Sequence, residues 1–268
     1  NVGGSLTPLG DPPLFLGFLK GISFFWTLQH IWPETLFMVG SLLALFYAMD
    51  TWAYRKEGVM RVDPTPDTRR LGFDGAVNFW LLGAVIALVL MSGLWKSSVE
   101  FNVWGTPVGL PGLLRDIGLV VITLVSLRIT PAGVHEDNQF SWGPMQEVAK
   151  LFAGIFLTII PVIAMLRAGK EGPFGAVVSL VTNPDGSPNP AMYFWATGVL
   201  SSFLDNAPTY LVFFNTAGGD PQALMTTYAT TLAAISAGAV FMGANSYIGN
   251  APNLMVKAIA EDRGVKMP

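Results

Sequence analysis

Two interrupted stretches, one near each end of the chain, constrain the fold more than any other feature. Residues 9–13 read Leu-Gly-Asp-Pro-Pro, and residues 248–252 read Ile-Gly-Asn-Ala-Pro. Each combines glycine, proline and a small polar residue, and each precedes an apolar run with helical character. Within a membrane, such a polar break is tolerated only where it is buried in protein or lines a cavity. Two breaks at corresponding places in two halves of a chain indicate the binding site of a transporter.

The composition places the chain in a membrane. Hydrophobic residues make up 51% of its 268 residues, charged residues only 12%, and the mean hydropathy is +0.50. A soluble domain carries about 25% charged residues. Runs of about 20 apolar residues, long enough to cross the hydrocarbon core, occur at about 31–54, 74–95, 112–130 and 147–168. Two further regions, about 173–217 and 222–262, are apolar but interrupted.

The basic residues indicate how the chain is oriented in the membrane, and the absence of cysteine excludes thiol chemistry. The densest group of Lys and Arg falls within residues 55–70, which the positive-inside rule places in the cytoplasm. The chain contains no cysteine, so disulfides, thiolate metal sites and cysteine nucleophiles are excluded. We therefore expect a multi-pass protein of the cell inner (cytoplasmic) membrane, with the lipid bilayer as its main partner and no binding of nucleic acid.

The order of runs and breaks predicts two related repeats joined by a linker. Residues 1–54 would form the end of the first repeat, a broken helix plus one span. Residues 55–73, which are polar and contain prolines, would form a cytoplasmic inter-repeat linker. Residues 74–268 would form the second repeat, with three spans, a re-entrant hairpin at about 173–217 and a broken helix at about 222–262. The two broken helices would cross in opposite directions, so the repeats would be inverted.

This division leaves the first repeat shorter than the second. The chain begins at Asn1, inside the first break, and ends at Pro268 soon after the second. If the halves are repeats, an N-terminal hairpin should precede Asn1 and a final span should follow Pro268. We therefore expect the sequence to be a fragment of a longer protein.

The breaks also supply the candidate binding residues. Interrupted helices expose unpaired N–H and C=O groups, and carboxylate, amide and hydroxyl oxygens are hard ligands of the kind that suit Na⁺. A carboxylate at Asp205 could exchange a proton for a cation, and Asp11 could do the same in the other break. The candidates for ion or substrate binding are Asp205, Asn206, Thr209, Asn245, Ser246, Asn250, Asn253, Ser5, Thr7 and Asp11. The sodium candidates among them are Asp205, Asn206, Asn245 and Ser246.

Structural explanations compete with these assignments. Asp205 could simply cap the second arm of the hairpin, although ionisable residues inside a membrane are rare and usually functional. Asn245, Ser246 and Asn250 could serve only as hydrogen-bonding groups between helices. Their clustering beside two glycines and a proline favours a shared role in binding.

At these motifs the chain resembles a known group. Residues 3–13, Gly-Gly-Ser-Leu-Thr-Pro-Leu-Gly-Asp-Pro-Pro, resemble the signature of NhaD-type sodium:proton antiporters and of the related citrate transporter family of the ion transporter superfamily. Residues 201–209, Ser-Ser-Phe-Leu-Asp-Asn-Ala-Pro-Thr, resemble their second hairpin. The resemblance implies an all-α multi-pass fold of two inverted repeats, each with a re-entrant hairpin and an unwound helix. It also implies a homodimer that moves by an elevator mechanism.

The substrate follows less directly from the sequence. Dicarboxylate carriers of the superfamily use Ser-Asn-Thr at their hairpin tips, whereas this chain has Asp-Asn-Ala-Pro-Thr. An acidic side chain would repel a carboxylate substrate and would attract a cation. We therefore expect a secondary transporter that exchanges sodium or lithium for protons by alternating access, with no cofactor beyond the transported ions. The alternative is a citrate, dicarboxylate or other anion transporter. A remote alternative is an intramembrane enzyme, which would need a nucleophile–base pair or metal ligands within the membrane. Ser246 and Asp205 could in principle meet, but no His, Cys or Lys lies near either.

Overall fold

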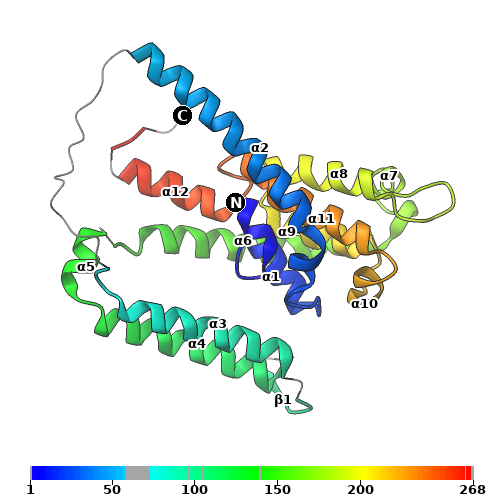
Figure 1. The fold of residues 1–268 in the computed structure, drawn as a ribbon. Helices are drawn as coiled ribbons and strands as arrows, with labels where there is room; N and C mark the ends of the chain where they lie inside the picture. The colour runs from blue at the N-terminus through cyan, green and yellow to red at the C-terminus, as the bar shows by residue number, and fades with distance from the viewer. Residues whose placement is uncertain are drawn as a thin grey trace. The chain divides into compact units, whose positions relative to one another are not determined.

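The computed structural model describes residues 2–57, 73–95, 97–103, 105–138, 140–262 and 264–266. It divides into two compact units, Asn1–Ala44 with Trp142–Pro268, and Leu45–Ser141. Most of the expected linker at 55–73 lies outside the described residues. In the described residues both units are mainly helical, and Figure 1 shows the helices in chain order from blue to red.

The first unit contains both breaks and the helices that pack against them. Its helical elements are η1 (Val2–Leu6), α1 (Pro12–Leu19), the first part of α2 (Trp26–Glu57), α6 (Gly143–Arg167), η2 (Gly169–Glu171), α7 (Gly175–Leu180), α8 (Pro190–Phe203), α9 (Asn206–Thr216), α10 (Pro221–Met225), α11 (Ala229–Met242), η3 (Gly243–Asn245) and α12 (Ala251–Asp262). Helices α8 and α11 form the most extensive pairing, and α9 packs against α1, α6, α8 and α11. Helix α9 therefore lies at the centre of this unit.

Short polar residues and prolines set where these helices begin. The side chain of Asn189 accepts a hydrogen bond from the Met192 N–H at 3.2 Å, and Pro190 occupies the first turn of α8. The side chain of Asp220 caps α10 in the same way, followed by Pro221. A proline in the first turn costs no helical hydrogen bond, and its φ angle already suits a helix. These caps explain why α8 and α10 start where they do.

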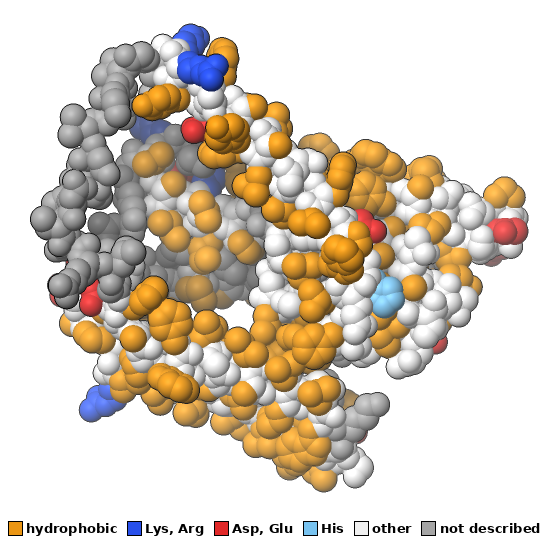
Figure 2. All heavy atoms as spheres, in the orientation of Figure 1, with side chains coloured by type: hydrophobic (Ala, Val, Ile, Leu, Met, Phe, Trp, Pro, Cys, Tyr) orange, Lys and Arg blue, Asp and Glu red, His pale blue; other side chains and the backbone are white. Residues whose placement is uncertain are grey.

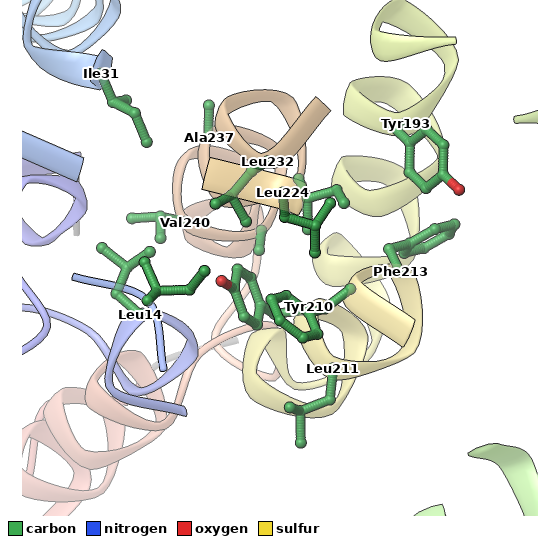
Figure 3. Packing of buried hydrophobic residues seen from close by; sticks show 14 of the residues in the cluster. Leu14, Ile31, Tyr193, Tyr210, Leu211, Phe213, Leu224, Leu232, Ala237 and Val240 are labelled. Atoms are coloured by element: carbon green, nitrogen blue, oxygen red, sulfur yellow. The ribbon is translucent and has the colours of Figure 1, made fainter. Parts of the chain in front are cut away.

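Large apolar side chains around α9 form the core of the first unit. Tyr210, Phe213 and Phe214 of α9 are fully or almost fully buried, together with Leu14 of α1 and Leu232 of α11. Figure 3 shows Leu14, Tyr210 and Leu232, which come from α1, α9 and α11, directed into one shared interior. The tip of α9 is thus held by packing along the whole of this helix, which keeps the groups at its N-terminus in place.

The second unit is a pair of apolar helices with short additions. It contains the end of α2, then α3 (Val77–Leu94), β1 (Glu100–Val103), β2 (Thr106–Gly109), α4 (Leu110–Ile129) and α5 (Ala132–Asp137). Helices α3 and α4 pack on each other, and Asn78 joins them by accepting hydrogen bonds from Ser126 at 2.9 Å and Thr130 at 3.2 Å. Most of their large apolar side chains are exposed, and Figure 2 shows hydrophobic atoms covering this region.

Three described helices are long and apolar enough to cross a membrane: Trp26–Lys56, Val77–Leu94 and Leu110–Ile129. The windows that qualify them are at most 11% buried within the protein. Apolar side chains that protein does not cover need lipid around them. The expected apolar runs at 31–54, 74–95 and 112–130 coincide with these helices, and the run at 147–168 corresponds to α6, which ends at Arg167. The prediction of an all-α multi-pass membrane protein is confirmed.

The structure adds one element that the sequence analysis did not expect. Residues 100–109 form an antiparallel hairpin of β1 and β2 between α3 and α4, with Glu100 opposite Gly109. Gly105, at a φ of +85°, makes the turn, and its N–H donates to the side chain of Asn102 at 2.7 Å. This small hairpin connects two helices and leaves the helical character of the unit unchanged.

Candidate functional site

Three helices begin beside one another at the polar breaks. Helix α1 starts after Asp11, α9 starts after Asp205, and α12 starts after Asn250. In each case the backbone carbonyl of the preceding residue accepts a hydrogen bond from the first turn of the helix. The N-terminal ends of the three helices carry partial positive charge. They therefore stabilise negatively charged side chains at the same place.

Asp11 joins the first break to the hairpin and to the second break. Its Oδ1 and Oδ2 atoms accept hydrogen bonds from the Nδ2 atom of Asn206, at 3.0 and 3.2 Å. They also accept from the Nδ2 atom of Asn250, at 3.2 and 3.1 Å. The exposed fractions are 3% for Asp11 and 0% for both asparagines. Residues from three distant parts of the chain thus form one buried cluster.

Asp205 completes this group at the tip of the hairpin. Its Oδ1 atom accepts a hydrogen bond from the Ala207 N–H at 2.9 Å and so caps α9. The next residue, Asn206, donates its backbone N–H to the carbonyl of Gly249 at 3.1 Å, which ties the hairpin tip to the second break. We call Asp11, Asp205, Asn206 and Asn250 the inner cluster.

Three buried oxygen atoms of the inner cluster receive no hydrogen bond from the described protein. They are Oδ2 of Asp205, Oδ1 of Asn206 and Oδ1 of Asn250. A buried polar atom without a partner costs about 1–3 kcal/mol, and native proteins contain few of them. All three atoms are acceptors, and none is a donor. Such a set matches a cation better than it matches an anion.

The expected capping role of Asp205 and its expected binding role are both compatible with this geometry. Oδ1 caps the helix, as the structural explanation requires. Oδ2 is buried and is not used by the cap. One carboxylate can therefore hold the end of α9 and still present an oxygen atom to a ligand.

A second group of predicted residues lies at the other side of the second break. Asn245 donates to the Ser202 hydroxyl at 2.9 Å, and the Ser246 hydroxyl donates to the Ser202 carbonyl at 2.6 Å. Asn253 donates its Nδ2 to the Ser246 carbonyl at 3.1 Å. Asn245 is exposed and the other two are half-buried. These side chains fasten the break to the end of α8, and we call Ser202, Asn245, Ser246 and Asn253 the outer cluster.

The remaining predicted residues serve local structure. The Thr209 hydroxyl donates to the Asp205 carbonyl at 2.9 Å, within the first turn of α9. The hydroxyl groups of Ser5 and Thr35 form a buried hydrogen bond of 2.6 Å, which attaches η1 to α2. The Thr7 carbonyl accepts the Gly10 N–H at 2.9 Å. None of these three contacts the asparagine side chains of the inner cluster through a hydrogen bond in the described part of the chain.

Sequence reasoning missed three hydroxyl groups that hold the site. Ser201 donates to the Ala239 carbonyl at 2.8 Å. Ser202 lies at the centre of the outer cluster, and Thr35 supports Ser5. The Ser201-Ser202 pair precedes the hairpin tip directly, so its position one turn before a break was an available signal. Thr35 lies within an apolar helix, and the sequence around it gives no signal of this contact.

In the part of the chain that the structure describes, no basic residue forms an ion pair with the carboxylates of the inner cluster. In the ranges that the structure describes, ion pairs join Arg115 to Asp116 and Lys257 to Glu261, and none involves Asp11 or Asp205. Bringing carboxylates out of water without a counter-charge is costly. A monovalent cation held by the three unpartnered oxygens would offset part of that cost.

An apolar cavity of about 580 Å³ lies beside the hairpin. Asp205 and Thr209 stand at its wall, but most of its lining is apolar, with residues such as Phe203, Val212 and Leu254. A hydrated ion needs several polar partners, which this lining does not offer. We therefore place the candidate site in the inner cluster and outside this cavity.

Comparisons with known proteins connect the chain to a family and to a named relative. The sequence profile of a family described as "Putative citrate transport" matches residues 1–268. The chain is also similar to the Na(+)/H(+) antiporter NhaB of Hahella chejuensis, with 28% identity over 128 residues. That match covers 47% of this chain and 25% of the relative, so it spans a quarter of the relative's length. No solved structure matches.

Proposed function

The chain belongs to this citrate transport family, and from that premise we propose that it is part of a secondary transporter that exchanges sodium or lithium for protons. The bound cation would lie in the inner cluster, where Asp205, Asn206 and Asn250 supply its ligands. The similarity to a sodium:proton antiporter supports this proposal. Lipid would surround its apolar helices, and we propose the inner membrane as its location and a homodimer as its assembly.

One observation carries the choice of a cation. The buried atoms of the inner cluster that lack a protein partner are all oxygen acceptors. An anion such as citrate needs donors, and the amide donors of Asn206 and Asn250 are already used by Asp11. Oxygen ligands of this kind suit a hard cation such as Na⁺.

The family description keeps citrate as a second candidate. The N-terminal ends of α1, α9 and α12 favour anions, and helix ends of this kind hold carboxylates in some transporters. In this chain the protein's own carboxylates, Asp11 and Asp205, already lie at two of those ends. A citrate ion would have to approach two like charges, which is unfavourable at close range.

Proton exchange requires a group that holds either a proton or a share of the cation. We propose Asp205 for this role because its Oδ2 atom is buried and receives no hydrogen bond from the protein. Binding of Na⁺ would require the ionised carboxylate, and protonation would remove its charge. Alternating access would then carry the cation in one direction and the proton in the other.

The test uses the complete natural protein in everted membrane vesicles with a pH-sensitive dye. Pulses of Na⁺ or Li⁺ should produce prompt proton movement, and a pulse of citrate should not. The substitution Asp205→Asn keeps the cap on α9 and removes the charge. It should abolish the cation response, whereas the matched substitution Asp185→Asn, in an exposed loop, should leave that response unchanged.

The opposite pattern would overturn the proposal. If citrate drives flux, no cation moves protons, and Asp205→Asn has no effect, the protein is an anion transporter and Asp205 is only a helix cap. Radiolabelled citrate uptake in the same vesicles measures that alternative directly.

A further inference from the structure

Resting on the cation site proposed above, we propose that Asp11 is a positioning residue that fixes the orientation of two asparagine side chains and thereby makes the site accept cations. Asp11 itself would not touch the bound ion. Its carboxylate would hold the amide nitrogens of Asn206 and Asn250, so that their amide oxygens are the atoms that remain for the ligand. The first break of the chain would thus determine the specificity of a site built by the hairpin tip and the second break.

The chemistry of the groups forces this orientation. An ionised carboxylate accepts hydrogen bonds and cannot donate them, and a primary amide has one donor end and one acceptor end. Both amides face Asp11 with their nitrogen atoms, at 3.0–3.2 Å. A turned amide would place its oxygen against the carboxylate oxygens, where the two would repel. Each asparagine therefore has one permitted orientation.

Burial prevents the two amide groups from turning. Both asparagines are fully buried, so water cannot replace Asp11 as the hydrogen-bond partner of an amide that has turned. In the permitted orientation, Oδ1 of each residue is the atom without a protein partner. The two oxygens that we assign to the cation are thus the direct consequence of the two nitrogens that Asp11 holds.

The position of Asp11 is itself fixed by the backbone. The carbonyl of Asp11 accepts hydrogen bonds from the N–H groups of Leu14 and Phe15, and its side chain makes no capping bond to α1. Pro12 and Pro13 follow it and restrict the backbone at the helix start. The carboxylate is therefore held in place by α1 and is available in full to the two asparagines.

A neutral amide at position 11 breaks this arrangement. The substitution Asp11→Asn leaves one acceptor oxygen and one donor NH₂ group facing two amide nitrogens. One of the two asparagines must then turn, which directs its NH₂ group into the site in place of an oxygen. We expect the dissociation constant for Na⁺ to rise by roughly tenfold or more, because a ligand is lost and a repelling dipole replaces it.

Exchanging the two residues should repair the defect. In the double variant Asp11→Asn with Asn250→Asp, the new amide at position 11 can donate its NH₂ group to the new carboxylate at position 250. Its oxygen can accept from Asn206, which then keeps its original orientation. A residue with a purely steric role would not be rescued by such an exchange of chemistry.

The experiment measures Na⁺ binding to the purified full-length protein by isothermal titration calorimetry, at constant ionic strength maintained with choline. It compares the wild type, Asp11→Asn, Asn250→Asp and the double variant. We expect weak binding in Asp11→Asn and an affinity in the double variant within about threefold of the wild type, since the arrangement of donors and acceptors is restored. Unchanged affinity in Asp11→Asn, or a double variant weaker than Asp11→Asn, would overturn the proposal.

A second measurement separates this proposal from the proposed function. Thermal unfolding of the same four proteins in Na⁺-free buffer reports the hydrogen bonds among Asp11, Asn206 and Asn250 without any ion. The single variants should melt lower than the wild type, and the double variant should recover most of the loss. Recovery without Na⁺ or Li⁺ binding in any variant would overturn the cation site and keep the orienting contact, whereas no recovery would overturn the orienting role itself.

Discussion

The two breaks of the chain have the same backbone design and differ in chemistry. In the first break Gly4 is followed six residues later by Gly10 and then by Asp11, and in the second Gly243 is followed six residues later by Gly249 and then by Asn250. In both, the paired glycines approach each other so closely that a methyl group on the second would meet the carbonyl of the first, at 2.5 Å for Gly10 and 2.7 Å for Gly249. In both, a helix begins directly after the last residue, whose carbonyl accepts a hydrogen bond from the first turn.

The difference at that last position allows the two breaks to bind each other. Asp11 and Asn250 occupy corresponding places and are joined by hydrogen bonds of 3.2 and 3.1 Å. Two aspartates at positions 11 and 250 would repel each other. Two asparagines could pair only if the NH₂ group of one faced the amide oxygen of the other. One acid and one amide give a stable contact with a single negative charge. The two breaks thus have similar backbones, and one difference between them lets Asp11 accept hydrogen bonds from Asn250.

The paired glycines offer the most severe test of the shared backbone design. Gly10→Ala or Gly249→Ala would force a methyl group against backbone carbonyls, and at Gly249 the Ser201 carbonyl is closer still. Backbone atoms cannot rotate away, so we expect each substitution to cost about 3 kcal/mol and to abolish transport. The melting temperature of the purified full-length protein and vesicle flux measure these losses.

Gly3 provides the matched control, because an added methyl group there meets nothing within 4 Å. Gly3→Ala should melt within a degree or two of the wild type, as surface substitutions usually do. A wild-type melting temperature for Gly10→Ala together with a large loss for Gly249→Ala would show that the two breaks do not share one design.

The sequence predicted much of this backbone arrangement because its signals are local. Apolar runs of sufficient length predict spanning helices, and Gly-Asp-Pro-Pro or Gly-Asn-Ala-Pro predicts an interruption. In the expected hairpin only residues 204 and 205 separate the two arms, because α8 ends at Phe203 and α9 begins at Asn206. Pro208 lies in the first turn of α9, where a missing N–H costs nothing. The hairpin at 100–109 was missed because its alternation covers only a few residues.

Making the two breaks alike in charge tests the difference between them. Asn250→Asp places a second carboxylate within hydrogen-bond distance of Asp11, where both groups are buried. The repulsion should lower stability by about 2 kcal/mol at neutral pH. The loss should shrink as the pH falls, because a proton taken up by either carboxylate removes the repulsion. Melting temperatures at pH 5 and pH 8, relative to the wild type at each pH, measure this.

The neutral substitution Asn250→Gln separates charge from size. It should destabilise the protein by the same amount at both pH values, because it adds no titrating group. If Asn250→Asp is no less stable at pH 8 than at pH 5 relative to the wild type, the carboxylates do not face each other and the geometry of the inner cluster is wrong.

The composition of the candidate site could be predicted, but its connections could not. Asp205, Asn206 and Asn250 were expected as ligands because polar residues at a membrane break are rare and usually functional. The role of Asp11 was assigned to a separate break, since no local pattern reveals a contact across 195 or 239 residues. Only packing around α9 brings the three segments together. The assignment of the cation itself remains a prediction of the geometry.

The smallest expected effect concerns the position three residues after the first glycine, Thr7 in one break and Ser246 in the other. The Gly249 N–H donates to the Ser246 hydroxyl at 3.1 Å, and that hydroxyl donates to Ser202. In the first break the Gly10 N–H donates instead to the backbone carbonyl of Thr7. Ser246→Ala therefore removes two hydrogen bonds and should cost about 1–2 kcal/mol, whereas Thr7→Val keeps its backbone bond and should cost less than about 0.5 kcal/mol. Equal losses of melting temperature in the two variants would mean that the side chain at this position stabilises both breaks. The contrast between a backbone contact at Thr7 and a side-chain contact at Ser246 would then have to be abandoned.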